Sequence, residues 1–364
     1  MRYKIDQLVQ LIMDYRGKTP KKLGMNWTEN QCDIVALSAK NIKDNKIVNT
    51  DKSHYGSESL YKRWMKDGDI EPGDILITSE APLGEVYLIT KPIKAILSQR
   101  LFLLRFNKNI VNPWYIFAFM NSQSFKNKLF SKATGTTVVG IKQKELRKIE
   151  IDLPNIRLQN KVGDIFRVIY KKIIINEIIN DNLLELAKAL FYEKFSYDDE
   201  ILLSNYFLPK RGKNLLKRNV VNGYIPVVAG GLTPAAFHNK SNTESPVITI
   251  SSSGANAGYT QIWGQKVWSS DSSYIDKTVT NNIYFWYLLI KSHQKQIFDS
   301  QTGSAQPHVY PRDIGNILIP KINEVVAKKV DKAVTPVFQK IFQNKDENKK
   351  LENIKAVLLD KYFD

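Results

Sequence analysis

The chain has 364 residues, of which 43% are hydrophobic and 11% aromatic, so it can build more than one folded core and is not a disordered chain. Its formal net charge of +17 and pI near 9.5 favour a polyanionic partner, most often nucleic acid, over the alternative of a generally basic proteome. The single cysteine, Cys32, excludes an internal disulfide and a cysteine-based metal cluster, and no apolar run reaches the length of a membrane span.

The first distinctive stretch is a basic loop, YRGKTPKK at 15–22. Gly17-Lys18-Thr19 is similar to the end of a nucleotide-binding phosphate loop, but Ile12 stands where that loop needs glycine, and Pro20 would disturb the following helix. We therefore expect no nucleotide site here. The functional interpretation is contact with DNA phosphates and the alternative is a solvated charge run; the candidate residues are Arg16, Lys18, Lys21 and Lys22.

Short β-like runs follow, and then a helix that we expect to begin at Asn112-Pro113, since Asn caps helices and Pro favours the first helical position. The stretch Asn112-Pro113-Trp114-Tyr115 faintly resembles the Asn/Asp-Pro-Pro-Tyr loop of amino-methyltransferases. Trp114 replaces the second proline of that loop, and no glycine-rich cofactor turn follows an upstream strand. The helix-cap interpretation is therefore preferred.

A Thr-Gly loop comes next, in TGTTVVGIKQKEL followed by the strand-like IDLP. Hydroxyl groups and cations on a glycine-hinged loop suit contact with DNA grooves and phosphates, and the alternative is a polar surface loop. The candidate residues are Thr134, Thr136, Thr137, Lys142 and Lys144.

Residues 157–195 predict one long helix, because they lack proline and their apolar residues recur at helical spacing. Residues 323–363 have the same pattern, except that Pro336 should kink or break that helix near Thr335. Long helices with an apolar stripe need a partner, so we expect the two to pair, although each could instead pack on its neighbouring globular segment. The packing candidates are Ile169, Ile173, Leu183, Leu186, Leu190, Leu351, Ile354 and Leu358.

Between these helices the chain repeats the order of its first segment. A basic loop, PKRGKNLLKR at 209–218, is followed by SSSGANAG at 251–258, which is by default a tight turn and alternatively a loop that faces DNA. A second internal helix should begin near Asn281 or Asn282, and a second Thr-Gly loop follows it. The candidate DNA-contacting residues of this copy are Arg211, Lys213, Ser252, Asn256, Thr302, Ser304, Gln306, His308 and Arg312.

The two copies also end alike, in LELAKALFYEKF at 184–195 and LENIKAVLLDKY at 351–362. A whole globular segment plus a long helix is thus written twice. The first copy is the longer one, and we expect its additional residues around 44–72.

In these features the chain resembles the DNA-specificity subunit of Type I restriction–modification enzymes. The resemblance rests on TGTTVVGIKQKEL with IDLP, on TGSAQPHVYPRDI with ILIP, and on the endings LAKALFYEKF and IKAVLLDKYF, and it covers essentially the whole chain. It implies a mixed α/β fold in which two long antiparallel helices form a coiled coil and separate two globular target-recognition domains, with an internal pseudo-twofold repeat. The expected boundaries are 1–155 and 197–321 for the domains, and 156–196 and 322–364 for the helices.

The resemblance also implies the function. Each domain would read one half of a bipartite, asymmetric target in double-stranded DNA, and the helices would dock two methyltransferase subunits, which restriction/translocase subunits join. S-adenosylmethionine, ATP and Mg²⁺ would belong to those partners, so this chain would be non-catalytic, without a bound cofactor or metal. The composition separately favours a cytoplasmic protein with no membrane partner. Two alternatives are a self-sufficient methyltransferase or nuclease with degenerate motifs and a coiled-coil adaptor that binds no DNA.

Overall fold

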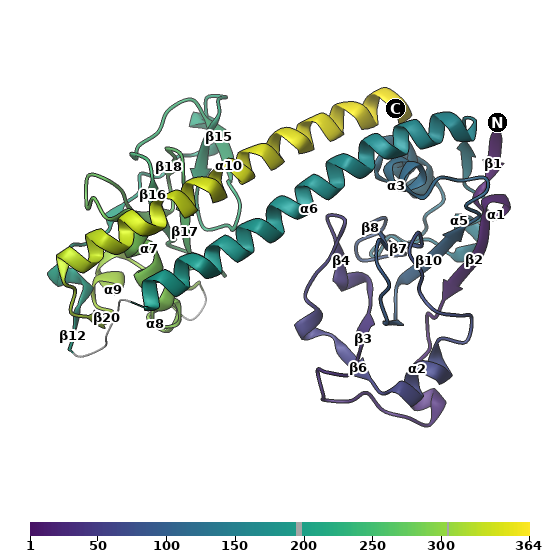
Figure 1. Cartoon of the computed structure of the whole chain (residues 1–364), viewed down its shortest axis with the longest axis horizontal. Coiled ribbons are helices and arrows are strands. Elements are labelled where there is room, and N and C mark those ends of the chain that lie inside the picture. Colours follow the sequence, from purple (N-terminus) through teal and green to yellow (C-terminus); the bar gives the residue numbers. More distant parts are fainter. Residues whose placement is uncertain (194–198, 304–305) are drawn as a thin grey trace. The chain divides into compact units, whose positions relative to one another are not determined.

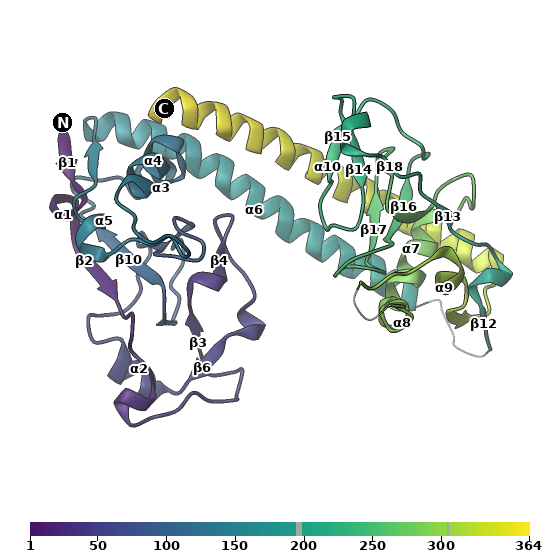
Figure 2. The same cartoon turned by 180° about the vertical axis from the view of Figure 1, so that it is seen from behind.

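The computed structural model describes residues 1–193, 199–303 and 306–364 (Figure 1; Figure 2 shows it from behind). The chain divides into two compact units. Unit 1 consists of Met1–Ile173 with Lys350–Asp364, and unit 2 consists of Ile174–Lys349. Each of the two long helices therefore contributes one part to each unit. The mixed α/β fold expected from the sequence is confirmed.

The strands of unit 1 are β1 (Arg2–Lys4), β2 (Val9–Asp14), β3 (Ile34–Leu37), β4 (Ile42–Lys43), β5 (Lys46–Ile47), β6 (His54–Gly56), β7 (Ile75–Thr78), β8 (Val86–Leu88), β9 (Ile96–Leu97), β10 (Leu101–Phe106) and β11 (Glu150–Asp152). The main sheet is antiparallel, in the order β2-β10-β7-β8. A second sheet has the order β6-β3-β9, in which β3 is antiparallel to β6 and parallel to β9. The strands β1 and β11 form one further pair, and β4 and β5 form another.

The sequence of β10, LFLLRF, is almost continuously apolar because both faces of this strand are covered. Leu101 and Leu103 belong to one hydrophobic core, while Phe102 and Leu104 belong to another. The alternation follows from the strand period of two residues. This strand therefore lies between two hydrophobic cores of unit 1 and contributes side chains to both.

The helices of unit 1 include one whose start the sequence predicted. They are α1 (Ile5–Leu8), α2 (Glu58–Trp64), α3 (Pro113–Asn121), α4 (Gln123–Ser131) and α5 (Gln143–Leu146). Asn112 Oδ1 accepts hydrogen bonds from the backbone N–H groups of Trp114 and Tyr115 at 2.9 and 3.0 Å, and Pro113 occupies the first helical position. The predicted cap at Asn112-Pro113 is confirmed. The α3 sequence is apolar on most sides of the helix, because the helix is buried in the core.

The elements of unit 2 are β12 (Glu200–Leu202), β13 (Lys210–Arg211), β14 (Ile225–Val228), β15 (Ala236–His238), β16 (Val247–Ser251), β17 (Thr260–Trp263), β18 (Trp268–Ser269), β19 (Ser272–Ile275), β20 (Leu318–Pro320), α7 (Ile283–Ser292), α8 (Gln294–Asp299) and α9 (Pro311–Gly315). The sheet orders are β13-β19-β16-β17, β15-β14-β18 and β12-β20. As predicted, α7 begins directly after Asn282, but Asn282 does not cap it. Instead, Asp331 Oδ1 accepts from the N–H groups of Tyr284 and Phe285 at 2.8 and 2.9 Å.

The two units repeat the same strand pairings. The sheet β2-β10-β7-β8 corresponds to β13-β19-β16-β17, and β6-β3-β9 corresponds to β15-β14-β18, including the parallel pair in each. Unit 1 adds the β4–β5 hairpin and α2 between β3 and β7. The matching residues 229–246 of unit 2 are all described, and outside β15 they contain neither helix nor strand. The extra elements of the first copy therefore lie mostly within the predicted stretch 44–72.

The two long helices are α6 (Ile156–Tyr192) and α10 (Glu324–Phe363). The expectation that Pro336 breaks the second helix is wrong, because α10 runs through it without interruption. Pro336 has no N–H group, so the carbonyl of Lys332, four residues earlier, lacks its usual helical donor. The neighbouring carbonyl of Asp331 accepts a hydrogen bond from Thr335 Oγ1 at 2.7 Å. Phe338, in the next turn, is fully buried, and this packing offsets the lost hydrogen bond.

The helices are antiparallel within each unit. In unit 1, the rings of Phe166 and Phe363 lie 5.9 Å apart, and Lys355 Nζ lies 4.9 Å from the ring centre of Tyr170, so residue numbers rise along α6 as they fall along α10. In unit 2, a buried polar layer joins the same two helices. Its contacts are Asn176 Nδ2 to Glu347 Oε2 at 2.7 Å, Asn176 Nδ2 to Asn348 Oδ1 at 2.8 Å, and Asn344 Nδ2 to Asn180 Oδ1 at 2.9 Å.

The repeated helix endings pack on globular cores. Leu183, Leu190, Ala187 and Phe191 of α6 join the core of unit 2, and Leu358, Leu359, Tyr362 and Phe363 of α10 join the core of unit 1. Ile169 and Ile173 are buried, and Leu351 is half-buried. Leu186 and Ile354 were also predicted to pack against the other helix or a partner subunit; their side chains are 48% and 50% exposed, so they do not pack in the interior of this chain, and their contact with a partner stays a prediction. The apolar stripe is wider than the contact face, and Ala187 rather than Leu186 faces inward.

Candidate nucleic-acid interface

The first Thr-Gly loop is a closed hairpin that rests on the end of β7. The Thr134 N–H donates to the Gly140 carbonyl at 2.8 Å, and the Gly140 N–H donates to the Thr134 carbonyl at 3.0 Å. The Ile141 N–H then donates to the Ser79 carbonyl at 2.9 Å. Gly135 has a φ of +111°, a conformation that favours glycine and turns the loop back on itself.

The second Thr-Gly loop closes in the same way on the end of β16. Thr302 and His308 exchange backbone hydrogen bonds of 3.0 and 2.8 Å, and the Val309 N–H donates to the Ser252 carbonyl at 3.0 Å. Gly303, with a φ of +89°, takes the place of Gly135. The candidate residue Ser304 lies outside the described residues.

Both loops present polar side chains to solvent. Those that are exposed, or in the case of His308 half-buried, are Thr134, Thr136, Thr137, Lys142, Lys144, Thr302, Gln306, His308 and Arg312. The structure thus makes these residues available to a ligand, and their contact with DNA stays a prediction.

The basic loop of unit 1 is less available than its sequence suggested. Arg16 forms an ion pair with Asp14 at 2.6 Å and donates to the Ile141 carbonyl at 3.2 Å, which fastens this loop beside the Thr-Gly hairpin. The Lys18 ammonium group donates to the Trp64 carbonyl at 2.6 Å, and burial lowers its pKa. Lys18 is therefore half-buried and engaged by the protein, and its contact with phosphate stays a prediction. Lys21 and Lys22 are exposed, although Lys22 Nζ also donates to the Gly17 carbonyl at 2.7 Å.

In unit 2, Arg211 is paired with Asp271 at 3.2 Å and lies over the ring of Tyr310 at 5.4 Å, while Lys213 is exposed. The stretch 251–258 covers the last residue of β16 and most of the turn between β16 and β17. The predicted DNA contact of Ser252 is wrong for this conformation, because Ser252 is fully buried. Asn256 is half-buried, and its Nδ2 donates to the Gly230 carbonyl at 3.3 Å.

Sequence reasoning missed an open cleft of about 520 Å³ in unit 1. Several segments far apart in the sequence line it with cations, aromatic rings, amides and hydroxyls; the lining residues are Lys18, Thr19, Pro20, Lys21, Asn26, Trp27, Ala36, Ser38, Ala39, Lys40, His54, Ala81, Ser98, Gln99 and Arg100. Such a mixture suits the phosphates and base edges of nucleic acid. The basic loop found in the sequence contributes Lys18 to Lys21, but no local motif marks the other lining residues, since each of their segments contributes only a few of them.

One wall of the cleft is held rigid by the stretch that unit 1 has in addition. The buried Asn41 side chain donates from Nδ2 to the Val48 carbonyl at 3.0 Å and to Ser53 Oγ at 2.9 Å, which closes this stretch on itself. The Ala39 N–H donates to the Gln99 carbonyl at 3.3 Å, so the wall is also joined to the segment before β10. The His54 ring stacks on Trp27 at 5.3 Å.

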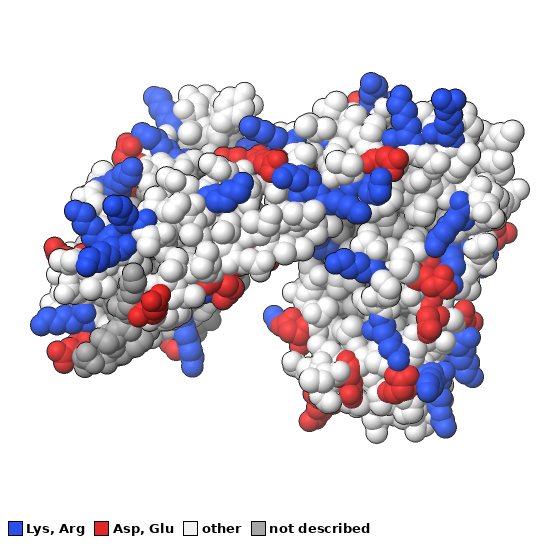
Figure 3. Space-filling model, in the orientation of Figure 1, with Lys and Arg blue, Asp and Glu red and all other residues white. Residues whose placement is uncertain are grey.

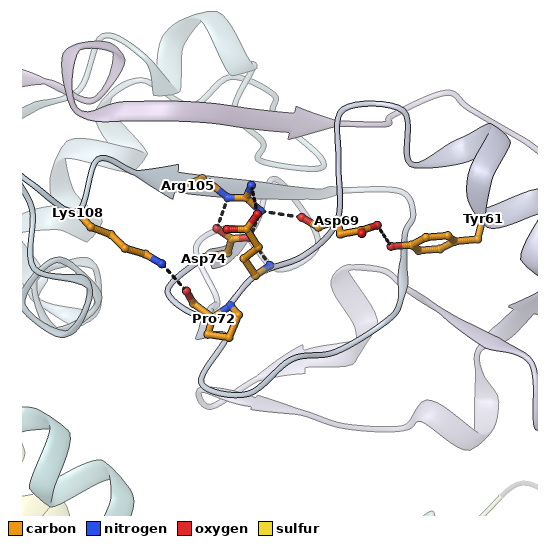
Figure 4. A network of polar contacts seen from close by, with 7 residues as sticks. Tyr61, Asp69, Pro72, Asp74, Arg105 and Lys108 are labelled. Carbon is orange, nitrogen blue, oxygen red and sulfur yellow. Dashed lines mark hydrogen bonds and ion pairs between the residues drawn. The ribbon is translucent and has the colours of Figure 1, made fainter.

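Not every polar network of unit 1 belongs to this cleft. Figure 4 shows Arg105 fixed in a network that ties the segment before β7 to β10. Its guanidinium donates from Nε and Nη2 to the buried Asp74 carboxylate, each at 2.8 Å, and also to the Asp69 carbonyl at 2.7 Å and to Glu71 at 2.8 Å. This arginine is engaged on all sides by the protein, so the network is structural.

The basic residues do not form one continuous patch on the face shown in Figure 3, where Lys and Arg lie among Asp and Glu. A net charge of +17 would attract a polyanion such as DNA in general, whatever its base sequence. Local side-chain arrangements at the loops and the cleft have to supply any selectivity.

Comparisons with known proteins identify the family of the chain. The family model described as "Type I restriction modification DNA specificity domain" matches residues 3–185. The chain belongs to this specificity family. The MjaIX specificity subunit, from a Type I restriction enzyme of Methanocaldococcus jannaschii, is 25% identical over an alignment 394 residues long. The alignment covers 95% of this chain and 89% of that protein.

The fold of this specificity-family member also matches a solved structure. The crystal structure of the S subunit of a Type I restriction–modification system from M. genitalium aligns with a TM-score of 0.65 and 20% identity, covering 100% of this chain and 96% of that one. Among the described residues, no helix is long and apolar enough to cross a membrane, and no group of three or more His, Cys, Asp or Glu could hold a metal ion.

Proposed function

We propose that this chain is the sequence-reading subunit of a Type I restriction–modification complex, in which unit 1 reads one half of a bipartite, asymmetric DNA target and unit 2 reads the other. The observation that carries the proposal is the duplicated frame. Each unit presents a closed Thr-Gly hairpin on the end of equivalent strands, with different side chains in each copy. Two similar frames with different surface residues suit two different half-sites.

The proposal includes a scaffolding role for the helices. Several apolar side chains on α6 are exposed, namely Ile175 at 49%, Ile178 at 53% and Leu186 at 48%. Exposed apolar residues gathered on one helix are typical of a protein-binding surface. They support docking of two methyltransferase subunits, which restriction/translocase subunits then join. In this proposal the chain is non-catalytic, and its partners bind S-adenosylmethionine, ATP and Mg²⁺.

The test of DNA reading is co-expression with the methyltransferase subunits of the same system, followed by mapping of methylated adenines across a genome. We expect methylation at one bipartite asymmetric sequence, and none when the chain is omitted. Methyl transfer or cleavage by the purified chain alone would contradict the non-catalytic role. DNA binding that does not weaken with salt, or no binding at all, would favour the adaptor alternative.

The scaffold is tested with Ile178→Asp, which places a charge in the exposed apolar surface of α6. We expect this variant to lose co-purification with the methyltransferase subunits while its melting temperature stays unchanged. The matched control is Val221→Asp, which changes an apolar side chain of similar exposure (54%) that lies outside the helices. Normal assembly of the Ile178→Asp complex would contradict docking at this surface.

A further inference from the structure

Arg100 lies at the corner between β9 and β10 in a backbone conformation that arginine rarely adopts. Its φ is +64°, in the left-handed region that disfavours residues with a side chain. The Ser79 N–H donates to the Arg100 carbonyl at 2.9 Å and holds this conformation. Strained residues of this kind persist where surrounding contacts determine them fully, and they gather at functional sites.

The guanidinium of Arg100 is oriented by one carboxylate. Glu80 Oε1 lies 2.7 Å from Arg100 Nε, and the arginine side chain stays 51% exposed. Within the described parts of the chain, neither terminal nitrogen of Arg100 donates a hydrogen bond to another residue. Arg100 also lines the cleft, so its half-exposed side chain borders a solvent-accessible site.

The Thr-Gly hairpin supports the carboxylate that orients this arginine. Gly140 pairs with both Thr134 and Glu80 through isolated β-bridges. A Cβ atom at position 140 would lie 3.1 Å from Glu80 Cβ and from Glu80 Oε2, closer than most Cβ contacts. Glycine at 140 therefore lets the hairpin close directly against Glu80, and the hairpin, Glu80 and Arg100 form one contiguous arrangement.

The contrast with Arg105 separates two uses of arginine in the same unit. Arg105 is 16% exposed and directs Nε, Nη1 and Nη2 at acceptors of the protein. Arg100 contacts its carboxylate through Nε and leaves the fork formed by its terminal nitrogens exposed. With Nε held by the Glu80 carboxylate, the two terminal nitrogens of Arg100 can donate two parallel hydrogen bonds to a ligand.

We infer that Arg100 is a specificity-determining residue that reads one guanine in the half-site bound by unit 1, and that Glu80 is its positioning residue. This inference rests on the proposed function. Guanine presents two adjacent acceptors, N7 and O6, to the major groove, and an arginine fork matches both. Adenine and cytosine each present an amino donor there, which an arginine fork cannot accept.

The experiment maps adenine methylation by the full complex that carries Arg100→Ala or Arg100→Lys. We expect one G·C pair, in one half of the motif only, to lose its discrimination by roughly 5- to 150-fold, because a bidentate contact of this kind is worth that factor. Arg100→Lys keeps the charge but not the fork, so it should relax the same pair. Glu80→Ala should relax that pair alone, to a smaller extent, which a general structural defect would not do.

The matched control is Arg147→Ala. Arg147 is also paired with a carboxylate, that of Asp6, and its side chain is 37% exposed, but it does not line the cleft. This variant should keep the wild-type motif. If Arg100→Ala lowers methylation equally at all sites and leaves the motif intact, Arg100 contacts a phosphate and the inference is overturned. A variant in which both the motif and the level of methylation stay unchanged would also overturn it. If the wild-type complex itself methylates no bipartite motif, the proposed function fails instead.

Discussion

In unit 1 the residue directly before β10 is Arg100, whereas in unit 2 the residue directly before the corresponding strand, β19, is Asp271. Their backbones are held alike, because the Ser79 N–H donates to the Arg100 carbonyl and the Ser252 N–H donates to the Asp271 carbonyl at 3.1 Å. One backbone hydrogen bond is thus repeated at the two corners, while the side chains differ in charge and Arg100, unlike Asp271, has a positive φ.

The corner of unit 2 has its own set of contacts. Asp271 accepts from Ser253 Oγ and forms the ion pair with Arg211. A carboxylate accepts hydrogen bonds and therefore cannot replace the arginine fork of unit 1 in contact with guanine. The two units are accordingly equivalent in fold and different in surface chemistry.

The largest predicted effect tests whether the two repeated helix endings are equivalent. Phe191 of α6 is 1% exposed in the core of unit 2, so Phe191→Ala should lower the free energy of unfolding by about 3–5 kcal/mol. Phe363 of α10 is only half-buried against the core of unit 1, and Phe363→Ala should have a clearly smaller effect. Denaturant unfolding of both variants measures the difference, and equal losses would contradict it.

A second prediction concerns the segment directly before β7 in unit 1. Arg105→Ala removes the partner of Asp74, which is 1% exposed, and leaves a buried carboxylate unpaired. We expect a loss of about 3 kcal/mol in the free energy of unfolding. The control Arg2→Ala removes an exposed ion pair with Asp152 and should change stability by less than about 1 kcal/mol. Equal effects would show that the network in Figure 4 is not structural.

The third prediction uses the different caps of equivalent helices. Asn112→Ala in unit 1 and Asp331→Ala in unit 2 should each cost about 1 kcal/mol, the usual value of a helix cap. Burial raises the pKa of Asp331 above its ordinary value of 3.8, despite the two backbone hydrogen bonds that lower it. The folded protein therefore binds a proton more tightly than the unfolded chain at this site.

The sign of the pH effect follows from this. Above pH 3.8 the Asp331 carboxyl is ionised in the unfolded chain but stays protonated in the folded protein until the pH reaches the higher folded-state pKa. Over this interval the unfolded chain gains stability relative to the folded protein, so the free energy of unfolding falls as the pH rises. Asp331→Asn keeps the acceptor oxygen and should remove that decrease, whereas Asn112→Ala should leave it in place. Thermal unfolding measured over acidic pH values checks both, and an unchanged pH profile in Asp331→Asn would contradict the assignment.

The smallest predicted effects are those of single cations on DNA affinity. Lys21→Ala and Lys40→Ala should each weaken binding to all sequences and reduce the slope of log affinity against log salt by about 1, since both are exposed and line the cleft. Arg16→Ala should change the slope less, because Arg16 is already paired with Asp14. Fluorescence anisotropy over a range of salt concentrations gives the slopes, and an equal change in all three would mean that Arg16 leaves its ion pair to meet DNA.

The sequence predicted features whose signal is local or periodic. The cap at Asn112-Pro113, the two long helices and the doubled segment are of this kind. Proline chemistry predicted a kink or a break at Pro336; the break is absent, because α10 runs through this residue, and Phe338 in the next turn is buried. The helical stripe likewise could not show that Leu186 faces outward, because an apolar pattern does not say which of its residues meet the partner.

The candidate site was harder to predict because it is assembled over long distances in sequence. The Thr-Gly loops were found by their glycine and hydroxyl content. Whether a basic side chain is available depends on partners such as Asp14 for Arg16 and the Trp64 carbonyl for Lys18, which sequence alone does not reveal. The corner residue Arg100 carries no sequence signal, since only the fold shows its positive φ and its contact with Glu80.

The most direct test of the two-reader account replaces residues 197–321 with the corresponding domain of another member of the specificity family. Methylated adenines are then mapped in cells that also express the methyltransferase subunits. The account predicts that one half of the motif changes while the other half, which contains the base pair relaxed by Arg100→Ala, stays the same. A motif that is unchanged, or one that changes in both halves, would contradict it.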